Sequence, residues 1–122
     1  MAEELKLPHN HQDIEKEAEI LRHLPDEEVI TTVAEALKQL GDPSRLRIFW
    51  LLCHTEECVI NIAALTNMSS PAVSHHLRLL KTAGLIVSRR DGKEMYYRAA
   101  DTNLVSKLHL TIEEIAEISC PS

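Results

Sequence analysis

The chain is 122 residues long, 44% of them hydrophobic and 26% charged, and its formal net charge at pH 7 is −6. This length and composition fit one globular domain with an aliphatic core, because the only aromatic residues are one Trp, two Tyr and one Phe. No apolar run approaches the roughly 18 residues that a transmembrane helix needs, and an acidic balance is unusual for a protein that binds nucleic acid.

The N-terminal half of the sequence indicates an arm followed by helices. Residues 1–11 are polar, contain Pro8 and show no apolar periodicity, so we expect a flexible arm there and one folded domain over residues 12–122. Asp26 and Asp42 each precede an amphipathic run and are suited to cap a helix. Apolar side chains at helical spacing predict helices over residues 12–23, 26–40, 43–53 and 59–65.

The stretch that follows predicts a helix, a β-hairpin and a last helix. Asn67 suits the left-handed conformation of a sharp turn between helices, and Ser69 suits the cap of the next helix. Asp91-Gly92 is a hairpin-turn pair between two β-type runs, and Asp101 is placed to cap the last helix. The helix is predicted at about 70–82, the strands near 85–89 and 95–99, and the last helix from Asp101 to about residue 118. This order is typical of a winged helix-turn-helix, a mostly α fold with a small β-hairpin.

The helix at 70–82 is predicted to have a buried side and an open side. Val73, Leu77 and Leu80 fall on the stripe that packs inward, and His76 is a weaker candidate for the open side. Serine, histidine and arginine on the open side can donate to base edges or phosphates. Basic residues beside the hairpin turn are expected along the DNA backbone or minor groove. The predicted DNA-binding residues are Ser69, Ser70, Ala72, Ser74, His75, Arg78, Arg89, Arg90 and Lys93.

The charge distribution supports this assignment. Residues 1–42 carry four Lys/Arg against eleven Asp/Glu, and residues 99–122 carry one against four. Residues 43–98 carry eight against four, so the basic excess lies in the segment predicted to touch phosphates. The alternative interpretation of this segment is an amphipathic helix with a structural hairpin, a unit that also occurs in proteins that bind no nucleic acid.

Three segments, residues 36–52, 56–65 and 69–98, resemble in order and spacing the ArsR/SmtB family of prokaryotic metalloregulatory repressors, in particular its CadC- and SmtB-type members. The resemblance implies a homodimer whose first and last helices form the interface. Such a dimer binds a palindromic operator when metal-free and releases it when its inducer binds. The recognition helix then corresponds to Ser69–Leu80 and the wing to Arg89–Glu94.

The resemblance implies a first metal site on the last helix. The family pattern is Asp-x-His on one subunit and, ten residues on, His-x-x-Glu or His-x-x-His on the other. The matching positions here are Asp101, Asn103, Glu114 and Glu117, so both histidines are replaced. Three carboxylates and an amide suit harder cations than zinc. Alternatively, these are capping and solvated residues of a terminal helix.

A second family site joins the N-terminal arm to the start of the fourth helix. The resemblance places Cys58 where the family has a thiolate ligand, and Asn61 where relatives supply an aspartate. His9 and His11 stand in the arm, where cadmium and lead sensors use cysteines. A Cys/His set suits Zn(II), Co(II) or Cu(I), so the expected inducer is Zn(II) or another transition or soft metal ion. Alternatively, Cys58 is a buried structural thiol and the two histidines are exposed surface residues.

The remaining thiols and histidines have simpler interpretations. Cys53 follows an apolar helix and is interpreted as a small core residue, whereas Cys120 lies in the C-terminal tail. His54 and His109 are interpreted as surface or hydrogen-bonded residues, and His109 with Glu113 as a hydrogen-bonded pair but no metal site. No secretory signal is visible, so three cysteines indicate reduced thiols in a cytoplasmic protein.

Together these patterns predict a metal-responsive transcriptional repressor, a homodimer that binds double-stranded DNA and no membrane. We expect no enzyme activity, because the sequence has no glycine-rich phosphate loop, nucleophile elbow or metalloprotease motif. Two alternatives stay open. One is a repressor of the same fold that responds to arsenite or oxidation through its thiols, or to no inducer. The other is an interaction module that does not bind DNA.

Overall fold

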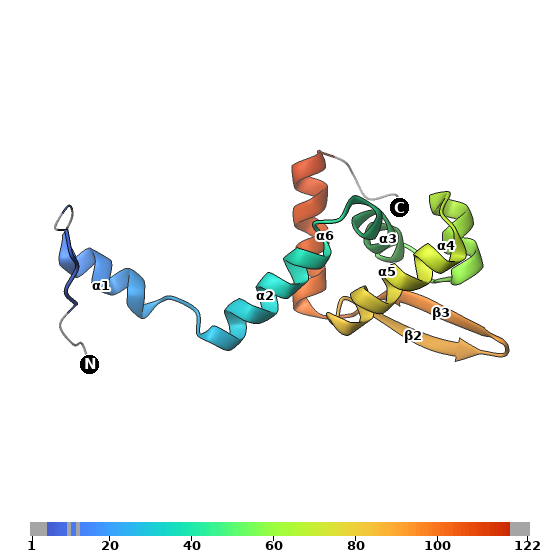
Figure 1. Ribbon diagram of the computed structural model, residues 1–122, viewed down its shortest axis with the longest axis horizontal. Coiled ribbons are helices and arrows are strands. Elements are labelled where there is room, and N and C mark those ends of the chain that lie inside the picture. The colour runs from blue at the N-terminus through green and yellow to red at the C-terminus, as the bar shows by residue number, and fades with distance from the viewer. Residues whose placement is uncertain (1–4, 10, 12, 118–122) are drawn as a thin grey trace. The chain divides into compact units, whose positions relative to one another are not determined.

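The computed structural model describes residues 5–9, 11 and 13–117, which fall into two compact units that divide between Thr31 and Thr32 (Figure 1). Helix α1 (Ile14–Arg22) belongs to the first unit, and α2 (Glu27–Gln39) crosses the boundary. The elements of the second unit are α3 (Pro43–Leu52), β1 (Glu57–Cys58), α4 (Val59–Thr66), α5 (Ser70–Thr82), β2 (Ile86–Asp91), β3 (Glu94–Ala99) and α6 (Asn103–Ala116).

Aspartates start the first three helices, and this was predicted for Asp26 and Asp42 but not for Asp13. The Asp13 carboxylate accepts the Glu15 N–H at 3.0 Å, and the Asp26 carboxylate accepts the Val29 N–H at 3.0 Å. Both bonds satisfy backbone donors that a helix leaves unpaired at its N-terminus. In α1, all of whose residues the structure describes, none is buried. No described helix is long and apolar enough to span a bilayer.

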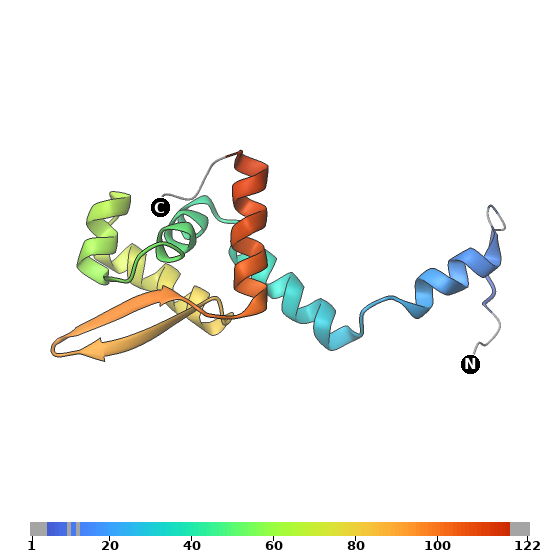
Figure 2. The same ribbon diagram turned by 180° about the vertical axis from the view of Figure 1, so that it is seen from behind.

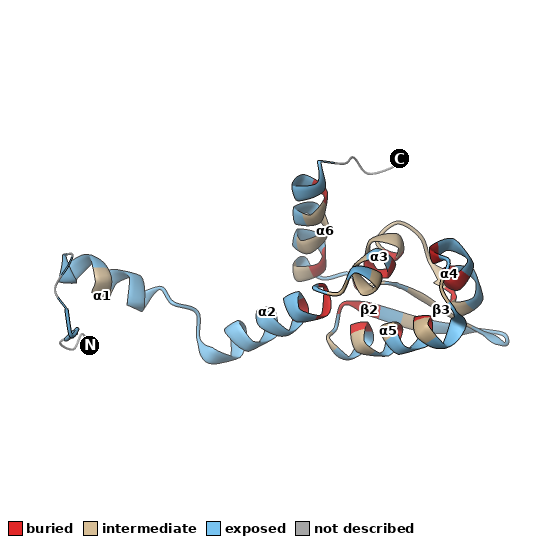
Figure 3. Ribbon diagram, turned by 45° about the horizontal axis from the view of Figure 1, so that its top comes forward, coloured by how far each residue is buried: buried red, intermediate tan, exposed pale blue. Residues whose placement is uncertain are grey.

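The core of the second unit is aliphatic around one aromatic ring. Buried positions gather where α3, α4, α5 and β2 face one another (Figure 3). Helix α3 packs against α4 and α5, and α5 packs against β2. The most fully buried large side chains are Ile48, Phe49, Ile62, Val73, Leu77, Leu80, Leu85 and Ile86. This core holds α5 rigidly along one stripe and leaves its other side open.

The turn between α4 and α5 is built as the sequence predicts. Asn67 ends α4 in the left-handed region, with φ 57° and ψ 48°. Ser69 then caps α5, because its Oγ accepts the Ala72 N–H at 3.2 Å. Pro71 lies in the first turn of α5, where its missing N–H leaves no bond unmade. Gly84, with φ +78°, ends the segment and directs the chain into β2.

The sheet has three antiparallel strands in the order β1-β3-β2. The β2–β3 hairpin turns at Gly92, whose φ is +66°, and Asp91 pairs with Glu94 across the turn. Seen from both sides, this hairpin extends beyond the helices of its unit (Figure 2). Strand β1 pairs with the other edge of β3, with Glu57 opposite Tyr97. The predicted hairpin is confirmed, whereas β1 was not predicted.

The cap of the last helix lies one residue later than predicted. Thr102, not Asp101, is the cap of α6, because its Oγ1 accepts the Val105 N–H at 3.2 Å. Thr102 has the extended backbone of a cap residue, with φ −130° and ψ 161°. The described part of α6 ends at Ala116, and the predicted extension to residue 118 reaches beyond the described residues.

Candidate nucleic-acid interface and metal centres

The open side of α5 carries polar and basic side chains. Val73, Leu77 and Leu80 on the inward stripe are at most 2% exposed. The six residues of this segment that were predicted to face DNA are all exposed except Ala72, which is half-buried. These residues are Ser69, Ser70, Ala72, Ser74, His75 and Arg78. The predicted division of the helix into two sides is therefore confirmed, and contact with DNA stays a prediction.

His76, a weaker candidate for the open side of α5, is half-buried instead and faces Arg45 of α3. Arg45 Nη1 donates to His76 Nδ1 at 3.2 Å, and since arginine has no acceptor, this imidazole nitrogen must carry a lone pair. Burial lowers the pKa of His76, although the nearby Asp42 carboxylate opposes the shift. His76 is thus a neutral residue that positions α5 against α3.

The wing arginine Arg89 is held by a carboxylate. Its Nε and Nη2 atoms donate to Glu56 at 2.9 and 2.8 Å, and its guanidinium lies 5.0 Å from the centre of the Tyr96 ring. The hydrogen bond from Arg89 lowers the pKa of Glu56, and the same bond raises the pKa of Arg89. Arg89 must leave Glu56 before it can pair with a phosphate.

Three other cations of the predicted interface have no such partner. Arg78, Arg90 and Lys93 are exposed, and within the described part of the chain none of them makes an ion pair or a side-chain hydrogen bond. Arg78 lies on the open side of α5, whereas Arg90 and Lys93 lie at the tip of the hairpin. This chain therefore offers unneutralised positive charge at two separate elements of the winged helix.

The residues of the predicted last-helix metal site lie apart within one chain. Asn103 and Glu114 are eleven residues apart on α6, a separation of about 16 Å along the helix axis. Asp101, Asn103, Glu114 and Glu117 are all exposed. One chain alone does not bring these four side chains to one ion, so the site stays a prediction that needs a second subunit.

The residues of the predicted arm site fall in both units. Cys58, at the start of α4, is 8% exposed, and the Asn61 side chain donates to Glu57 Oε1 at 3.1 Å. In the first unit His9 and His11 are exposed, with their rings stacked 5.3 Å apart. Their joint coordination of a metal ion with Cys58 stays a prediction.

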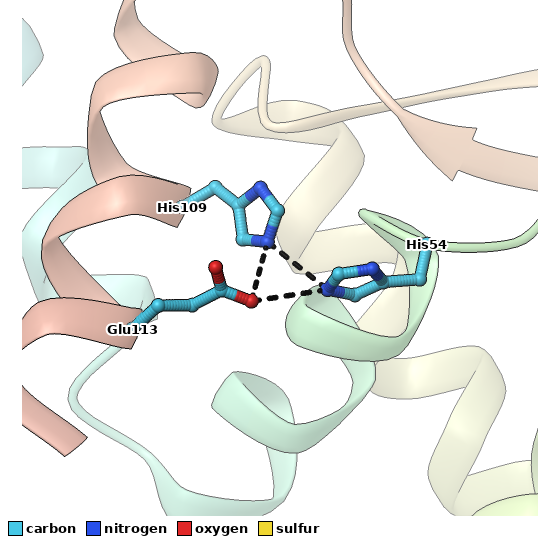
Figure 4. A group of neighbouring side chains, drawn as sticks. All are labelled: His54, His109 and Glu113. Carbon is cyan, nitrogen blue, oxygen red and sulfur yellow. Dashed lines mark hydrogen bonds and ion pairs between the residues drawn. The ribbon is translucent and has the colours of Figure 1, made fainter. Parts of the chain in front are cut away.

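A third group of ligand-type side chains was missed at the sequence level. His54, His109 and Glu113 bring two imidazoles and a carboxylate together between the end of α3 and α6 (Figure 4). The predicted hydrogen bond between His109 and Glu113 is present at 3.0 Å, but His54 joins it, with its Nε2 3.0 Å from His109 Nε2 and 3.3 Å from Glu113 Oε2. The interpretation of His109 and Glu113 as no more than a pair on one helix face is corrected here. Sequence spacing gave no sign of His54, which lies 55 residues before His109.

The group lies beside a pocket and is positioned by an indole. A pocket of about 430 Å³ is lined by residues from the end of α3, from β3 and from α6, among them Cys53, Asp101 and His109. Trp50 Nε1 donates to Glu113 Oε2 at 3.1 Å and fixes the carboxylate from the side of α3. The group is therefore largely buried and one of its histidines faces an open pocket.

Comparison with known proteins decides the family. The sequence profile described as "Bacterial regulatory protein, arsR family" matches residues 42–88. The cadmium resistance transcriptional regulatory protein CadC homolog of Staphylococcus aureus is 39% identical over 90 aligned residues, which span 70% of this chain and 74% of that protein. The chain belongs to the ArsR family. The resemblance seen in the sequence is confirmed, and this is a family of regulatory proteins rather than enzymes.

Further relatives support the ArsR assignment. The transcriptional repressor SmtB homolog of Synechocystis is 38% identical over 85 residues, and the match spans 70% of this chain but 64% of that protein's length. A homodimeric winged helix-turn-helix DNA-binding domain from Mycobacterium bovis, described as a possible ArsR-family regulator, has a TM-score of 0.68 at 33% identity and covers 78% of this chain and 89% of its own. NolR from Sinorhizobium fredii has a TM-score of 0.69 at 26% identity, and the match covers 91% of this chain and 100% of the NolR chain. The winged helix-turn-helix fold is thereby confirmed.

The extent of the family match separates two parts of this ArsR-family chain. Residues 42–88 include α3, α4 and α5 and the start of β2, which carry the predicted recognition helix. The arm and α6, which supply most of the candidate metal ligands, lie outside the match. The family assignment therefore bears on the DNA-binding elements more directly than on any inducer site.

Proposed function

We propose that the chain is a transcriptional repressor that binds a palindromic operator as a homodimer and releases it when a metal ion binds. The observation that carries the proposal is exposed positive charge on two elements, Arg78 on the open side of α5 and Arg90 and Lys93 at the wing tip, none of which makes an ion pair among the described residues. Arginine reads guanine or phosphate by bidentate hydrogen bonds, and wing cations pair with the backbone. The predicted DNA contacts of Ser69, Ser70, Ala72, Ser74, His75 and Arg89 are part of this proposal.

The terminal helices support the homodimer. Large apolar side chains remain exposed on α2 and α6, and exposed apolar surface of this kind marks protein interfaces. On α2 they are Val29, Ile30, Val33 and Leu37, and on α6 they are Leu110 and Ile115. We propose that α1, α2 and α6 form the interface, in keeping with the homodimeric relative from Mycobacterium bovis.

The name of one relative supports a metal inducer. It is called a cadmium resistance transcriptional regulatory protein. This chain offers three sets of ligand-type residues: Cys58 with His9 and His11; Asp101 with Glu114 and Glu117; and the His54, His109 and Glu113 group. The two sets that contain histidine favour Zn(II) or another transition or soft metal over Mg(II) or Ca(II), whereas the carboxylate set suits harder cations.

Fluorescence anisotropy tests the proposal. A labelled duplex is first selected from a random library with metal-free full-length protein and then titrated with and without Zn(II), Co(II), Cd(II), Pb(II), Mn(II) and arsenite. We expect at least one metal to weaken binding by about fivefold or more, a typical coupling between two sites. If no metal changes the affinity, the metal response is wrong. If only arsenite or an oxidant weakens binding and Cys58→Ser abolishes this effect, the protein responds through its thiols and not to a metal ion.

The DNA face has its own test in the same assay. The double substitution Arg78→Ala with Arg90→Ala removes an exposed cation from each element of the proposed interface. If the selected duplex still binds with wild-type affinity, the assignment of α5 and the wing to DNA is wrong.

A further inference from the structure

His54, His109 and Glu113 bring three atoms that can bind a metal ion close to one another. Three atoms converge: His54 Nε2, His109 Nε2 and Glu113 Oε2, separated by 3.0, 3.0 and 3.3 Å (Figure 4). An imidazole nitrogen either carries a proton or presents a lone pair, and a carboxylate oxygen presents lone pairs only. Both imidazole N–H groups can donate to the carboxylate, and the same three atoms can instead present their lone pairs to one cation.

The spacing of the three atoms suits a metal ion, which can accept a lone pair from each of them. Zinc binds histidine nitrogen at about 2.0–2.1 Å and carboxylate oxygen at about 2.0–2.2 Å in tetrahedral geometry, which places neighbouring ligand atoms about 3.3–3.5 Å apart. The three observed separations are equal to this spacing or shorter by a few tenths of an ångström. The side chains thus need only small movements to hold an ion.

Burial and support from a neighbour point the same way. The side chains of His54, His109 and Glu113 are 16%, 21% and 9% exposed, and Glu113 is the only buried acidic residue in the described part of the chain. A buried carboxylate requires a compensating charge or hydrogen bonds. Trp50 Nε1 donates to the same Glu113 oxygen, as groups outside a metal site do when they orient a carboxylate ligand.

We propose that His54 Nε2, His109 Nε2 and Glu113 Oε2 form a site for one transition-metal ion of the Zn(II), Co(II) or Ni(II) class within each protomer. That this ion is the inducer rests on the repressor function proposed above. Two imidazoles with one carboxylate favour this class over Mg(II) and Ca(II), which prefer all-oxygen ligand sets. Three protein ligands leave a fourth position, which water can reach through the pocket that His109 lines.

The site would join α6 to the DNA-binding core. His54 follows the C-terminal end of α3, and His109 and Glu113 lie on α6. Helix α3 in turn packs against α5, the proposed recognition helix. An ion at this point ties α6 to the end of α3 without a ligand from a second subunit. This separates it from the last-helix site, whose ligands one chain does not bring together.

Cobalt binding to metal-free full-length protein in the absence of DNA tests the site. We expect one Co(II) per protomer, with the visible absorption of tetrahedral cobalt, and displacement by Zn(II). His109→Gln and Glu113→Gln should each weaken binding by at least about tenfold, because even groups that only orient a ligand contribute that much. His23→Asn is the matched control, because His23 also lies four residues from a glutamate, Glu19, but is exposed.

The outcomes separate the site from the alternatives. Wild-type cobalt affinity in His109→Gln overturns the proposal, as does loss of binding in Cys58→Ser or Asp101→Ala instead. If His109→Gln does not fold, the imidazole ¹⁵N resonances of the wild-type protein test the site instead. Those of His54 and His109 should shift on adding one equivalent of Zn(II), and unshifted resonances at saturation overturn the proposal.

The test also distinguishes this site from the repressor function. If cobalt binds at the His54 group but the affinity for the selected duplex does not change, the site stands and the proposed metal response fails. If metal still releases the duplex from His109→Gln, the metal response stands and this group is not the inducer site.

Discussion

The wing is expected to act on DNA through Arg90 more than through Arg89. Arg89 donates two hydrogen bonds to Glu56, at 2.9 and 2.8 Å, so its charge is already neutralised in the protein. Arg90 is exposed at the neighbouring position of β2 and makes no ion pair among the described residues. Replacing Arg90 with glutamine should therefore remove a phosphate contact, whereas Arg89→Gln should change the affinity for DNA little.

The salt dependence of binding gives the size of the effect. Each neutralised phosphate contributes about 0.9 to the slope of log affinity against log salt concentration. In a homodimer Arg90→Gln removes two contacts, so the slope should fall by about 1.8. Between about 50 and 200 mM salt, wild-type protein should then lose about tenfold more affinity than Arg90→Gln does.

Anisotropy titrations of the selected duplex at several salt concentrations measure both slopes. Arg89→Gln serves as the matched control, because it removes the same charge from the same strand. If Arg89→Gln lowers the slope as much as Arg90→Gln, the Glu56 pair opens on DNA and the reasoning is wrong. An unchanged slope in Arg90→Gln means that this side chain does not reach a phosphate.

Three further predictions concern neighbouring contacts. Glu56→Gln should release Arg89, strengthen duplex binding and steepen the salt slope by up to about 0.9 per protomer; weaker binding contradicts this. Asn67→Ala should destabilise the protein by about 1 kcal/mol in urea unfolding, because alanine is strained in the left-handed conformation, and Asn67→Gly should not. Burial lowers the pKa of His76 below its ordinary 6.5, so the native state binds fewer protons than the unfolded state. This contribution to stability is complete above about pH 6.5 and is lost as the pH falls through the lowered pKa, and urea midpoints of His76→Gln should change less over that range.

Local chemistry explains which parts of the fold were predictable. Asn67 and Ser69 act through contacts within three or four residues, so their sequence alone indicated the turn and the cap. The Asp91-Gly92 pair likewise indicated the hairpin. Strand β1 has only two residues and exists because Glu57 pairs with Tyr97, a contact that no local pattern contains. Asp101 and Thr102 are both good cap residues, so the sequence did not distinguish between them. The structure shows that α6 starts at Asn103, which makes Thr102 the cap.

The same distinction applies to the candidate sites. Apolar periodicity indicated the open side of α5, because the position of the buried stripe on a helix also determines which residues lie opposite it. The pairing of Arg89 with Glu56 joins residues 33 apart, and the approach of His54 to His109 joins residues 55 apart. The first depends on the sheet that joins β1, β3 and β2, and the second on how α6 packs against the end of α3. Of the His54 group, only the pair of His109 and Glu113, four residues apart on one helix, was visible in the sequence.

Reciprocal coupling gives the most direct test of metal-controlled DNA binding. If metal weakens operator binding by some factor, operator binding must weaken metal affinity by the same factor. Cobalt affinity is therefore measured on free protein and on protein saturated with the selected duplex. We predict an affinity at least about fivefold weaker on the duplex, equal to the factor by which cobalt weakens DNA binding. Equal cobalt affinities in the two states would contradict the proposed function.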